Sequence, residues 1–95
     1  MSKLIDSAVR ALAEKLGGGF EGVAKFVIEG EGAIMMDRRG VRAGDDEAEV
    51  TLTASADTFR GILEGDVNPT TAFMSGKLKI DGPMNLAIKL GAVLS

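Results

Sequence analysis

The sequence predicts an α+β domain, and the order of its hydrophobic patterns is the evidence. Apolar residues with helical spacing come first, from Lys3 to Leu16. Short segments that alternate polar and apolar residues follow as far as Ala54, and this alternation is typical of strands. From Ser55 onward, helix start and stop signals surround one further short strand. A chain of 95 residues with this order of elements indicates one domain that spans residues 1–95.

The N-terminal half is predicted to hold one helix and an antiparallel series of strands. Leu4, Ala8 and Leu12 form one ridge of the helix, and the glycines at 17–19 end it. Because these glycines follow a helix and no Gly-Lys-Ser/Thr motif is present, they do not indicate a phosphate-binding loop. The predicted strands cover Phe20–Glu29, Ala33–Asp37, Val41–Ala43 and Glu49–Ala54.

The C-terminal half begins with two short helices and a strand. Ser55 and Asn68 are predicted N-caps, and Pro69 occupies the first position of the second helix. Gly65 and Gly76 are placed where the two helices should end. Residues 77–81 then alternate polar and apolar side chains, which predicts a half-buried strand.

The last predicted helix, Met84–Leu94, is apolar on nearly every side. It begins after a Gly-Pro pair, and only Asn85 and Lys89 are polar, both on one narrow stripe. An ordinary surface helix has a single apolar face, and this helix is too short to cross a membrane. Three interpretations stay open: burial in the core, a contact between two copies, or one wall of an apolar ligand cavity.

The composition argues against catalysis and against several classes of ligand. The chain has no Cys and no His, which removes thiol nucleophiles, imidazole bases and most zinc sites. A net charge of −3 without a basic run argues against nucleic-acid binding. Glu29, Asp37 and Asp81 are predicted to be solvated, so no pair of carboxylates is set up for acid–base chemistry. We therefore expect no enzyme activity, no catalytic residue and no cofactor.

Two charged loops have a functional and an ordinary interpretation. The acidic loop 45–47, with Glu49, could hold a hard cation, but it lacks the spacing of a calcium loop and is predicted to be a solvated turn without metal. Arg38, Arg39 and Arg42 form a basic patch at a hairpin. This patch either protects a sheet edge, which is the interpretation we favour, or contacts phospholipid headgroups.

The chain also lacks targeting signals that sequence can reveal. No signal peptide or transmembrane run is present, and the final residues from Ala92 to Ser95 are not the Ser-Lys-Leu peroxisomal signal. We therefore expect a cytoplasmic location. The net charge of −3 disfavours strong docking on anionic membranes, although a transient membrane contact is compatible with it.

Residues 68–90, NPTTAFMSGKLKIDGPMNLAIKL, resemble the signature stretch of the sterol-carrier-protein-2 family of small lipid-binding domains. The matching positions are Asn68, Pro69, Ala72, Phe73, Gly76, Lys77, Leu78, Ile80, Gly82, Met84, Leu86, Ala87, Lys89 and Leu90. Met74 departs from the pattern because a second aromatic residue is common there, and Pro83 replaces a residue that is commonly polar.

The resemblance implies both a fold and a site. The implied fold is a five-stranded, mainly antiparallel sheet with helices packed on one side, with the strand at 78–80 placed beside the first strand. An apolar tunnel is implied between the sheet and the C-terminal helices. The side chains that would touch or surround a lipid there are Met36, Phe59, Ile62, Leu63, Phe73, Met74, Met84, Ile88 and Leu90.

The function implied by the resemblance is binding and transfer of a hydrophobic ligand without covalent chemistry. The ligand would be a fatty acid, an acyl-CoA, an isoprenoid quinone or a sterol. An alternative from another class is an accessory module of a lipid or quinone biosynthesis complex, which would use the apolar C-terminal helix as its interface. The sequence leaves open whether the protein is a monomer or a weak homodimer.

Overall fold

The structure is a computed structural model that describes residues 3–17 and 20–94. Its elements in chain order are α1 (Lys3–Leu16), β1 (Ala24–Ile28), β2 (Gly32–Asp37), β3 (Gly40–Ala43), β4 (Val50–Ala54), α2 (Ala56–Glu64), α3 (Pro69–Met74), β5 (Leu78–Asp81) and α4 (Met84–Leu94). Each helix and strand that the sequence predicts is present.

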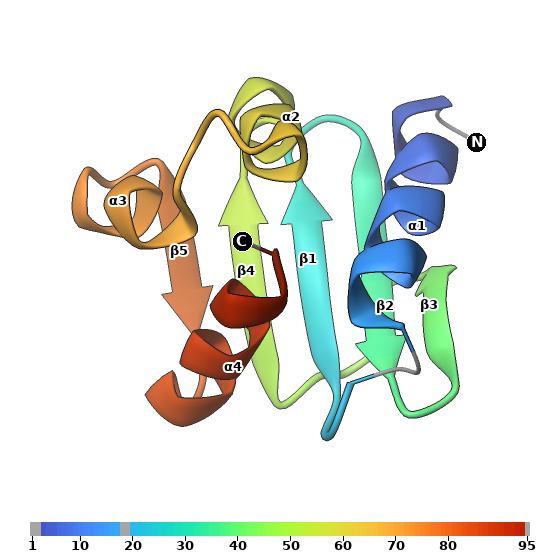
Figure 1. The fold of residues 1–95 in the computed structure, drawn as a ribbon. Coiled ribbons are helices and arrows are strands. Elements are labelled where there is room, and N and C mark those ends of the chain that lie inside the picture. Colours follow the sequence, from blue (N-terminus) through green and yellow to red (C-terminus); the bar gives the residue numbers. More distant parts are fainter. Residues whose placement is uncertain (1–2, 18–19, 95) are drawn as a thin grey trace.

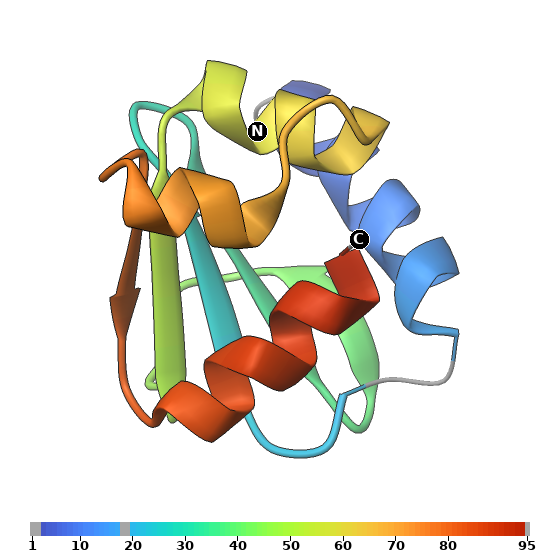
Figure 2. The same cartoon turned by 60° about the vertical axis from the view of Figure 1, so that its left-hand side comes forward.

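The five strands form one open sheet in the order β3-β2-β1-β4-β5. The pairing of β1 with β4 is parallel, and the other three pairings are antiparallel. All four helices lie on one face of the sheet, in front of it in Figure 1 and on one side of it in Figure 2. The predicted fold class, a mainly antiparallel sheet covered by helices on one side, is confirmed.

Two details of the expected strand order are wrong. The fifth strand pairs with β4, where Leu52 lies opposite Ile80, and not with the first strand. Both edges of β1 are already hydrogen-bonded, to β2 on one side and to β4 on the other, so β5 cannot pair with β1 and instead lies at the outer edge of β4. In addition, β4 does not continue the antiparallel series beside β3, because it runs parallel to β1.

A parallel pairing needs a connection that crosses the sheet, and residues 44–49 form it. This crossing segment passes over the face opposite the helices, behind the sheet in Figure 1. The Lys25 ammonium, on that face, contacts the Asp45 carboxylate at 2.8 Å. Met35 lies on the same face and is almost completely buried, with Gly44 directly against its side chain. The acidic loop 45–47 is therefore part of an ordered segment that crosses the sheet, and it is not only a solvated turn.

The hydrophobic core fills the space between the helices and the inner face of the sheet. Along β1 and β4 the inner residues alternate with half-buried ones, as the sequence pattern predicts. Two aromatic rings stand at the centre of the core, where Phe26 and Phe59 meet edge to face with ring centroids 4.5 Å apart. The core lies mainly over β1, β2 and β4, and the outer strand β5 contributes Leu78 to it.

Local signals set the ends of the elements as predicted. The Ser55 hydroxyl accepts a hydrogen bond from the Thr58 N–H, and the Asn68 side chain accepts from the Thr70 and Thr71 N–H groups. Gly65 ends α2 in the left-handed conformation, with φ of 84°.

The strand predicted from Phe20 begins only at Ala24, because Gly22 has a φ of 104°, which interrupts extended backbone. Of the glycines predicted to end α1, Gly17 donates its N–H to the Ala13 carbonyl at 3.1 Å. Gly18 and Gly19 lie outside the described residues.

Candidate functional site

An apolar cavity of about 520 Å³ lies between the outer strands β4 and β5 and the helices α3 and α4. Its walls are formed by Leu52, Pro69, Thr70, Phe73, Met74, Leu78, Ile80, Met84, Ala87, Ile88, Gly91 and Ala92. None of these side chains is charged, and only Thr70 carries a polar group. The cavity is therefore suited to an apolar ligand of small-molecule size.

The periodicity of each element brings these residues to one place. On α4, Met84, Ile88, Gly91 and Ala92 follow the spacing i, i+4, i+7 and i+8 and form a single stripe. On β5, Leu78 and Ile80 are two residues apart and therefore face the same side of the sheet.

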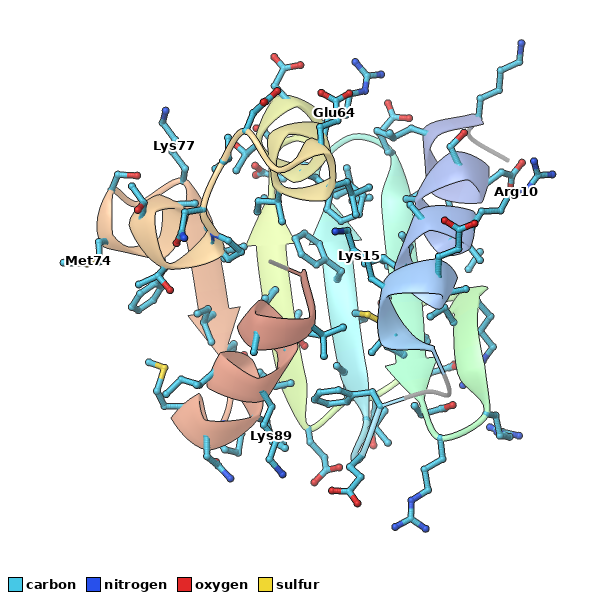
Figure 3. The ribbon with its side chains drawn as sticks, viewed as in Figure 1. Arg10, Lys15, Glu64, Met74, Lys77 and Lys89 are labelled. Atoms are coloured by element: carbon cyan, nitrogen blue, oxygen red, sulfur yellow. The ribbon has the colours of Figure 1, made fainter. Side chains whose placement is uncertain are left out.

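Helix α3 supplies the third wall of the cavity and is held in place by its N-cap. The Asn68 side chain accepts two backbone hydrogen bonds, at 2.9 and 3.2 Å, which fix the first turn of this six-residue helix. Phe73 and Met74 extend from its last turn, and Figure 3 shows Met74 at the outer edge of the molecule. The wall thus depends on a short helix that packs against β5.

The cavity opens to the surface, and its rim is unusually apolar. The exposed fraction is 80% for Met74, 66% for Ile88, 49% for Met84 and 39% for Phe73. These four are the large hydrophobic residues that the structure exposes within the described ranges, and all of them line this one cavity. Soluble monomers rarely expose large apolar patches, and such patches are often interaction sites, so this rim is a candidate binding site.

The structure brings together some of the residues that the sequence singled out. Phe73, Met74, Met84 and Ile88 line the cavity. Met36, Phe59, Ile62 and Leu90 are almost completely buried and belong to the core. Leu63 lines a separate depression between α1 and α2.

Helix geometry explains why Leu90 and Ile88 have different roles. Residues two apart on a helix point in nearly opposite directions, at about 200°. Ile88 therefore faces the cavity while Leu90 packs into the core. Phe59 is directed away from the cavity by its contact with Phe26 under α2.

The sequence interpretation omitted several lining residues that a signal in the sequence could have found. Gly91 and Ala92 continue the stripe that begins at Met84 and Ile88, so helical spacing alone identifies them. Leu78 and Ile80 are the inward positions of an alternating strand. Leu52 required knowledge of the strand pairing, because only the contact of β4 with β5 brings it to the cavity.

A second cluster of polar side chains lies at the other side of the sheet, and it corrects one prediction. Asp37 was expected to be solvated, but its side chain is only 12% exposed and lies 2.9 Å from the Arg42 guanidinium. The hydrogen bond from Arg42 lowers the pKa of Asp37 below its ordinary value, although burial acts in the opposite direction. The Arg39 N–H also donates to this carboxylate, at 2.9 Å.

This cluster accounts for part of the basic patch at the hairpin. Arg42 is paired with Asp37, and the Arg39 guanidinium lies 4.0 Å from the same carboxylate. The cluster belongs to β2 and β3, at the opposite edge of the sheet from β5 and the cavity. Its charges therefore do not form part of the cavity wall.

Within residues 3–17 and 20–94, no helix has the length and hydrophobicity needed to cross a membrane. The same ranges hold no group of three or more acidic side chains placed to bind a metal ion.

The sequence of this chain matches a known protein family. The model of the SCP-2 sterol transfer family matches residues 2–95. This chain belongs to the SCP-2 sterol transfer family. The match covers nearly the whole sequence, including residues 68–90, where the resemblance is most specific.

Among solved structures, this SCP-2 domain is similar to Aedes aegypti Sterol Carrier Protein-2 in complex with the C16 fatty acid palmitate. That likeness has a TM-score of 0.80 and 27% sequence identity, and it covers 100% of this chain and 97% of the other. Sterol Carrier Protein 2 Like 2 of the same mosquito gives a TM-score of 0.79 at 20% identity, over 95% of each chain. The second likeness shows that the fold is shared.

A curated relative of this SCP-2 domain is the Xenopus laevis Hydroxysteroid dehydrogenase-like protein 2, which is 36% identical over 100 residues. The alignment covers 97% of this chain and 23% of that protein. The chain thus spans less than a quarter of the relative's length, and the likeness concerns one part of a longer protein.

Proposed function

We propose that this domain binds a single hydrophobic lipid in the cavity between β5, α3 and α4 and transfers it reversibly, without covalent chemistry. The observation that carries the proposal is the cavity itself, which has an uncharged wall and a rim of exposed apolar side chains. Membership of the SCP-2 sterol transfer family supports the same function. A cytoplasmic location, expected from the sequence, is part of the proposal.

A fatty acid is the ligand that we propose first. The Aedes aegypti protein with a TM-score of 0.80 holds palmitate, and it is 27% identical to this chain. The wall offers little for a polar ligand to bind, since the Thr70 hydroxyl is the one polar side-chain group that lines it. Recognition in this cavity would therefore rest on the length and shape of an apolar chain.

Binding would be driven by removal of apolar surface from water. Each methylene group buried in the cavity contributes about 0.8 kcal/mol, so about ten buried methylenes would contribute about 8 kcal/mol before the cost of association. The exposed rim contributes as well, because a bound chain would cover Met74 and Ile88, which are largely exposed in the structure. The same covering removes the unfavourable contact of these side chains with water.

The proposal excludes catalysis by this domain. Among the described residues no titratable side chain lines the cavity, so the wall supplies no general acid or general base and no base that would activate the Thr70 hydroxyl as a nucleophile. The dehydrogenase-like relative aligns over only 23% of its own length. We propose that the activity indicated by that relative's name belongs to the part of it that this chain does not match.

The direct test is to extract the purified protein with organic solvent, identify lipids by mass spectrometry, and titrate the lipid-free protein with palmitate. We expect a co-purified acyl lipid, saturable palmitate binding, and a melting temperature that rises with palmitate concentration. Absence of both lipid and palmitate binding would refute the proposal.

A pair of variants assigns the binding to the cavity. Ile88→Glu places a carboxylate in the cavity wall and should weaken palmitate binding by about tenfold or more, because the bound chain would bury that charge. Asn85→Glu introduces the same group on the exposed side of α4, outside the cavity wall, and should leave the affinity unchanged. Equal affinity of the two variants would place the bound lipid elsewhere.

A further inference from the structure

The methionines of this chain occupy two opposite kinds of environment. Four of the five methionines lie within the described residues. Met35 and Met36 are 1% and 0% exposed, one on each face of the sheet. Met74 and Met84 are 80% and 49% exposed, and both line the cavity. The described methionine side chains that water reaches are therefore those at the proposed lipid site.

Methionine is also the side chain of this sequence that a peroxide oxidises most readily. The chain contains no Cys, His, Trp or Tyr, so no thiol, imidazole, indole or phenol competes for the oxidant. Oxidation of methionine gives the sulfoxide, which reductases can convert back. Because the oxidant must reach the sulfur, exposure selects Met74 and Met84, and burial protects Met35 and Met36.

The chemical step is the transfer of one oxygen atom to a thioether. A lone pair of the methionine Sδ attacks one oxygen of the peroxide, so the S–O bond forms and the O–O bond breaks. The bonding electrons leave with the other oxygen, which takes the proton of the attacked oxygen. With hydrogen peroxide the products are the sulfoxide and one molecule of water, so the sulfur is oxidised and the peroxide is reduced.

We propose that Met74 and Met84 form an oxidation site at which a peroxide controls lipid binding. Conversion of both side chains to sulfoxides makes the cavity wall polar, and the domain then releases its lipid. Reduction of the sulfoxides restores the apolar wall and the affinity. The proposal rests on the proposed function, since it concerns the wall of the same cavity.

The loss of affinity follows from the chemistry of the wall. A bound acyl chain would cover the two methionines, so each sulfoxide oxygen would lose the water that solvates it. The Thr70 hydroxyl is the one hydrogen-bond donor among the side chains that line the cavity. At least one of the two oxygens would therefore be buried without a partner from the wall, and burial of an unpaired polar group opposes binding.

The two methionines also act on different walls. Met74 belongs to the last turn of α3, and Figure 3 shows it at the outer edge of the molecule. Met84 is the first residue of α4, on the stripe that continues through Ile88. Because α3 and α4 stand on different sides of the cavity, oxidation of both residues changes two of its walls at once.

The site of oxidation can be tested by treating the lipid-free protein with hydrogen peroxide and digesting it with trypsin. Cleavage after Lys and Arg puts each exposed methionine on a peptide of its own and the two buried methionines together on a third. These peptides cover residues 61–77, 80–89 and 26–38. Mass spectrometry should find that the first two gain oxygen well before the third. Oxidation of peptide 26–38 first would overturn the proposed site.

The consequence can be tested by titrating the oxidised protein with palmitate. The affinity should fall by about tenfold or more when Met74 and Met84 are both sulfoxides. Treatment with methionine sulfoxide reductases should restore it to within about twofold of the untreated value. The circular dichroism spectrum should stay the same throughout, because the oxidised side chains lie outside the buried core.

The matched control is the double variant Met74→Leu/Met84→Leu, which keeps both side chains apolar and removes both exposed sulfurs. Its palmitate affinity should be the same before and after peroxide treatment. The variant retains Met1, which lies outside the described residues, as well as Met35 and Met36. An effect of peroxide on any of these three would therefore appear in the variant too, and a similar loss of affinity there would overturn the proposal.

Failure of this proposal can be distinguished from failure of the proposed function. If the untreated native protein binds palmitate and still binds it equally well with both sulfoxides formed, the oxidation proposal is refuted and the proposed function stands. If the untreated native protein does not bind palmitate, the proposed function is refuted, and the oxidation proposal falls with it.

Discussion

Gly82 lies directly against Val50, and this contact sets the point where the chain leaves β5 for α4. A Cβ atom built on Gly82 would lie 2.8 Å from the Val50 Cα and closer still to the Glu49 carbonyl oxygen. The backbone at Gly82 has a φ of 133°, which side chains rarely adopt. Any larger residue here must therefore displace either β4 or the start of α4, which carries one wall of the cavity.

Gly82→Ala should destabilise the protein by about 2–4 kcal/mol, because it combines backbone strain with a steric clash. Gly30→Ala is the matched control: its φ is 79°, but no atom lies within 4 Å of the added Cβ. It should cost only about 1 kcal/mol, the conformational part alone. Chemical denaturation of both variants measures the difference, and equal losses would show that the contact with Val50 is unimportant.

The paired carboxylate of Asp37 should make stability depend on pH. Its pKa in the folded protein is lowered below the ordinary value of 3.8, chiefly by the hydrogen bond from Arg42. A lowered folded pKa means that the stabilisation is complete above the unfolded value and is lost as pH falls through the folded value. Asp37→Asn should therefore be less stable than the native protein at pH near 7, and the difference should shrink below about pH 4.

Denaturant titrations near neutral pH and at about pH 3 would test this prediction. Asp46→Asn serves as the control, since Asp46 is exposed on the crossing segment, and its stability should follow the native protein at both pH values. A constant difference between Asp37→Asn and the native protein across the range would contradict the assigned ion pair.

The sequence predicted local structure well because the signals that set it are short-range. The N-caps at Ser55 and Asn68 act through backbone groups two or three residues away, and both are confirmed. The position of β5 depends instead on which sheet edges are free after β1 pairs with β4, and local patterns carry no such information. The environment of Asp37 was misjudged for the same reason, since its partner Arg42 comes from the next strand.

The residues of the candidate site could also be predicted only in part, because long-range packing decides which of them meet. Phe73, Met74, Met84 and Ile88 were singled out together, and they line one cavity because α3 and α4 both pack beside β5. Met36 and Phe59 have the same apolar character in sequence, yet both lie in the core. Composition cannot separate a core side chain from a cavity wall, because the distinction depends on what stands opposite it.

Phe59 and Phe73 should therefore respond oppositely to truncation. Phe59 is fully buried against Phe26, so Phe59→Ala should lose about 3–5 kcal/mol of stability. Phe73 is partly exposed on the cavity wall, so Phe73→Ala should lose under about 1 kcal/mol. The expected loss of palmitate affinity for Phe73→Ala is about fivefold, from reduced apolar contact. If both variants lost stability and palmitate affinity to a similar extent, the division between core and cavity wall would be wrong.

Gly91 offers a way to separate stability from ligand binding. It lies within α4 and lines the cavity, and a Cβ added there would meet no atom within 4 Å. Replacement of a helical glycine should stabilise α4 by about 0.5–1 kcal/mol, because the backbone loses less freedom on folding. Gly91→Leu should show this gain and should also place its side chain in the cavity, which leaves less room for an acyl chain.

Gly91→Ala is the matched control, because it brings the same helical gain with a single methyl group. We expect both variants to melt at a higher temperature than the native protein when lipid is absent. Only Gly91→Leu should lose palmitate binding, by about tenfold or more, since its isobutyl group occupies the volume that the ligand needs. Calorimetric titration with palmitate measures the affinities. Undiminished binding by Gly91→Leu would mean that the lipid occupies a place other than the wall formed by α4.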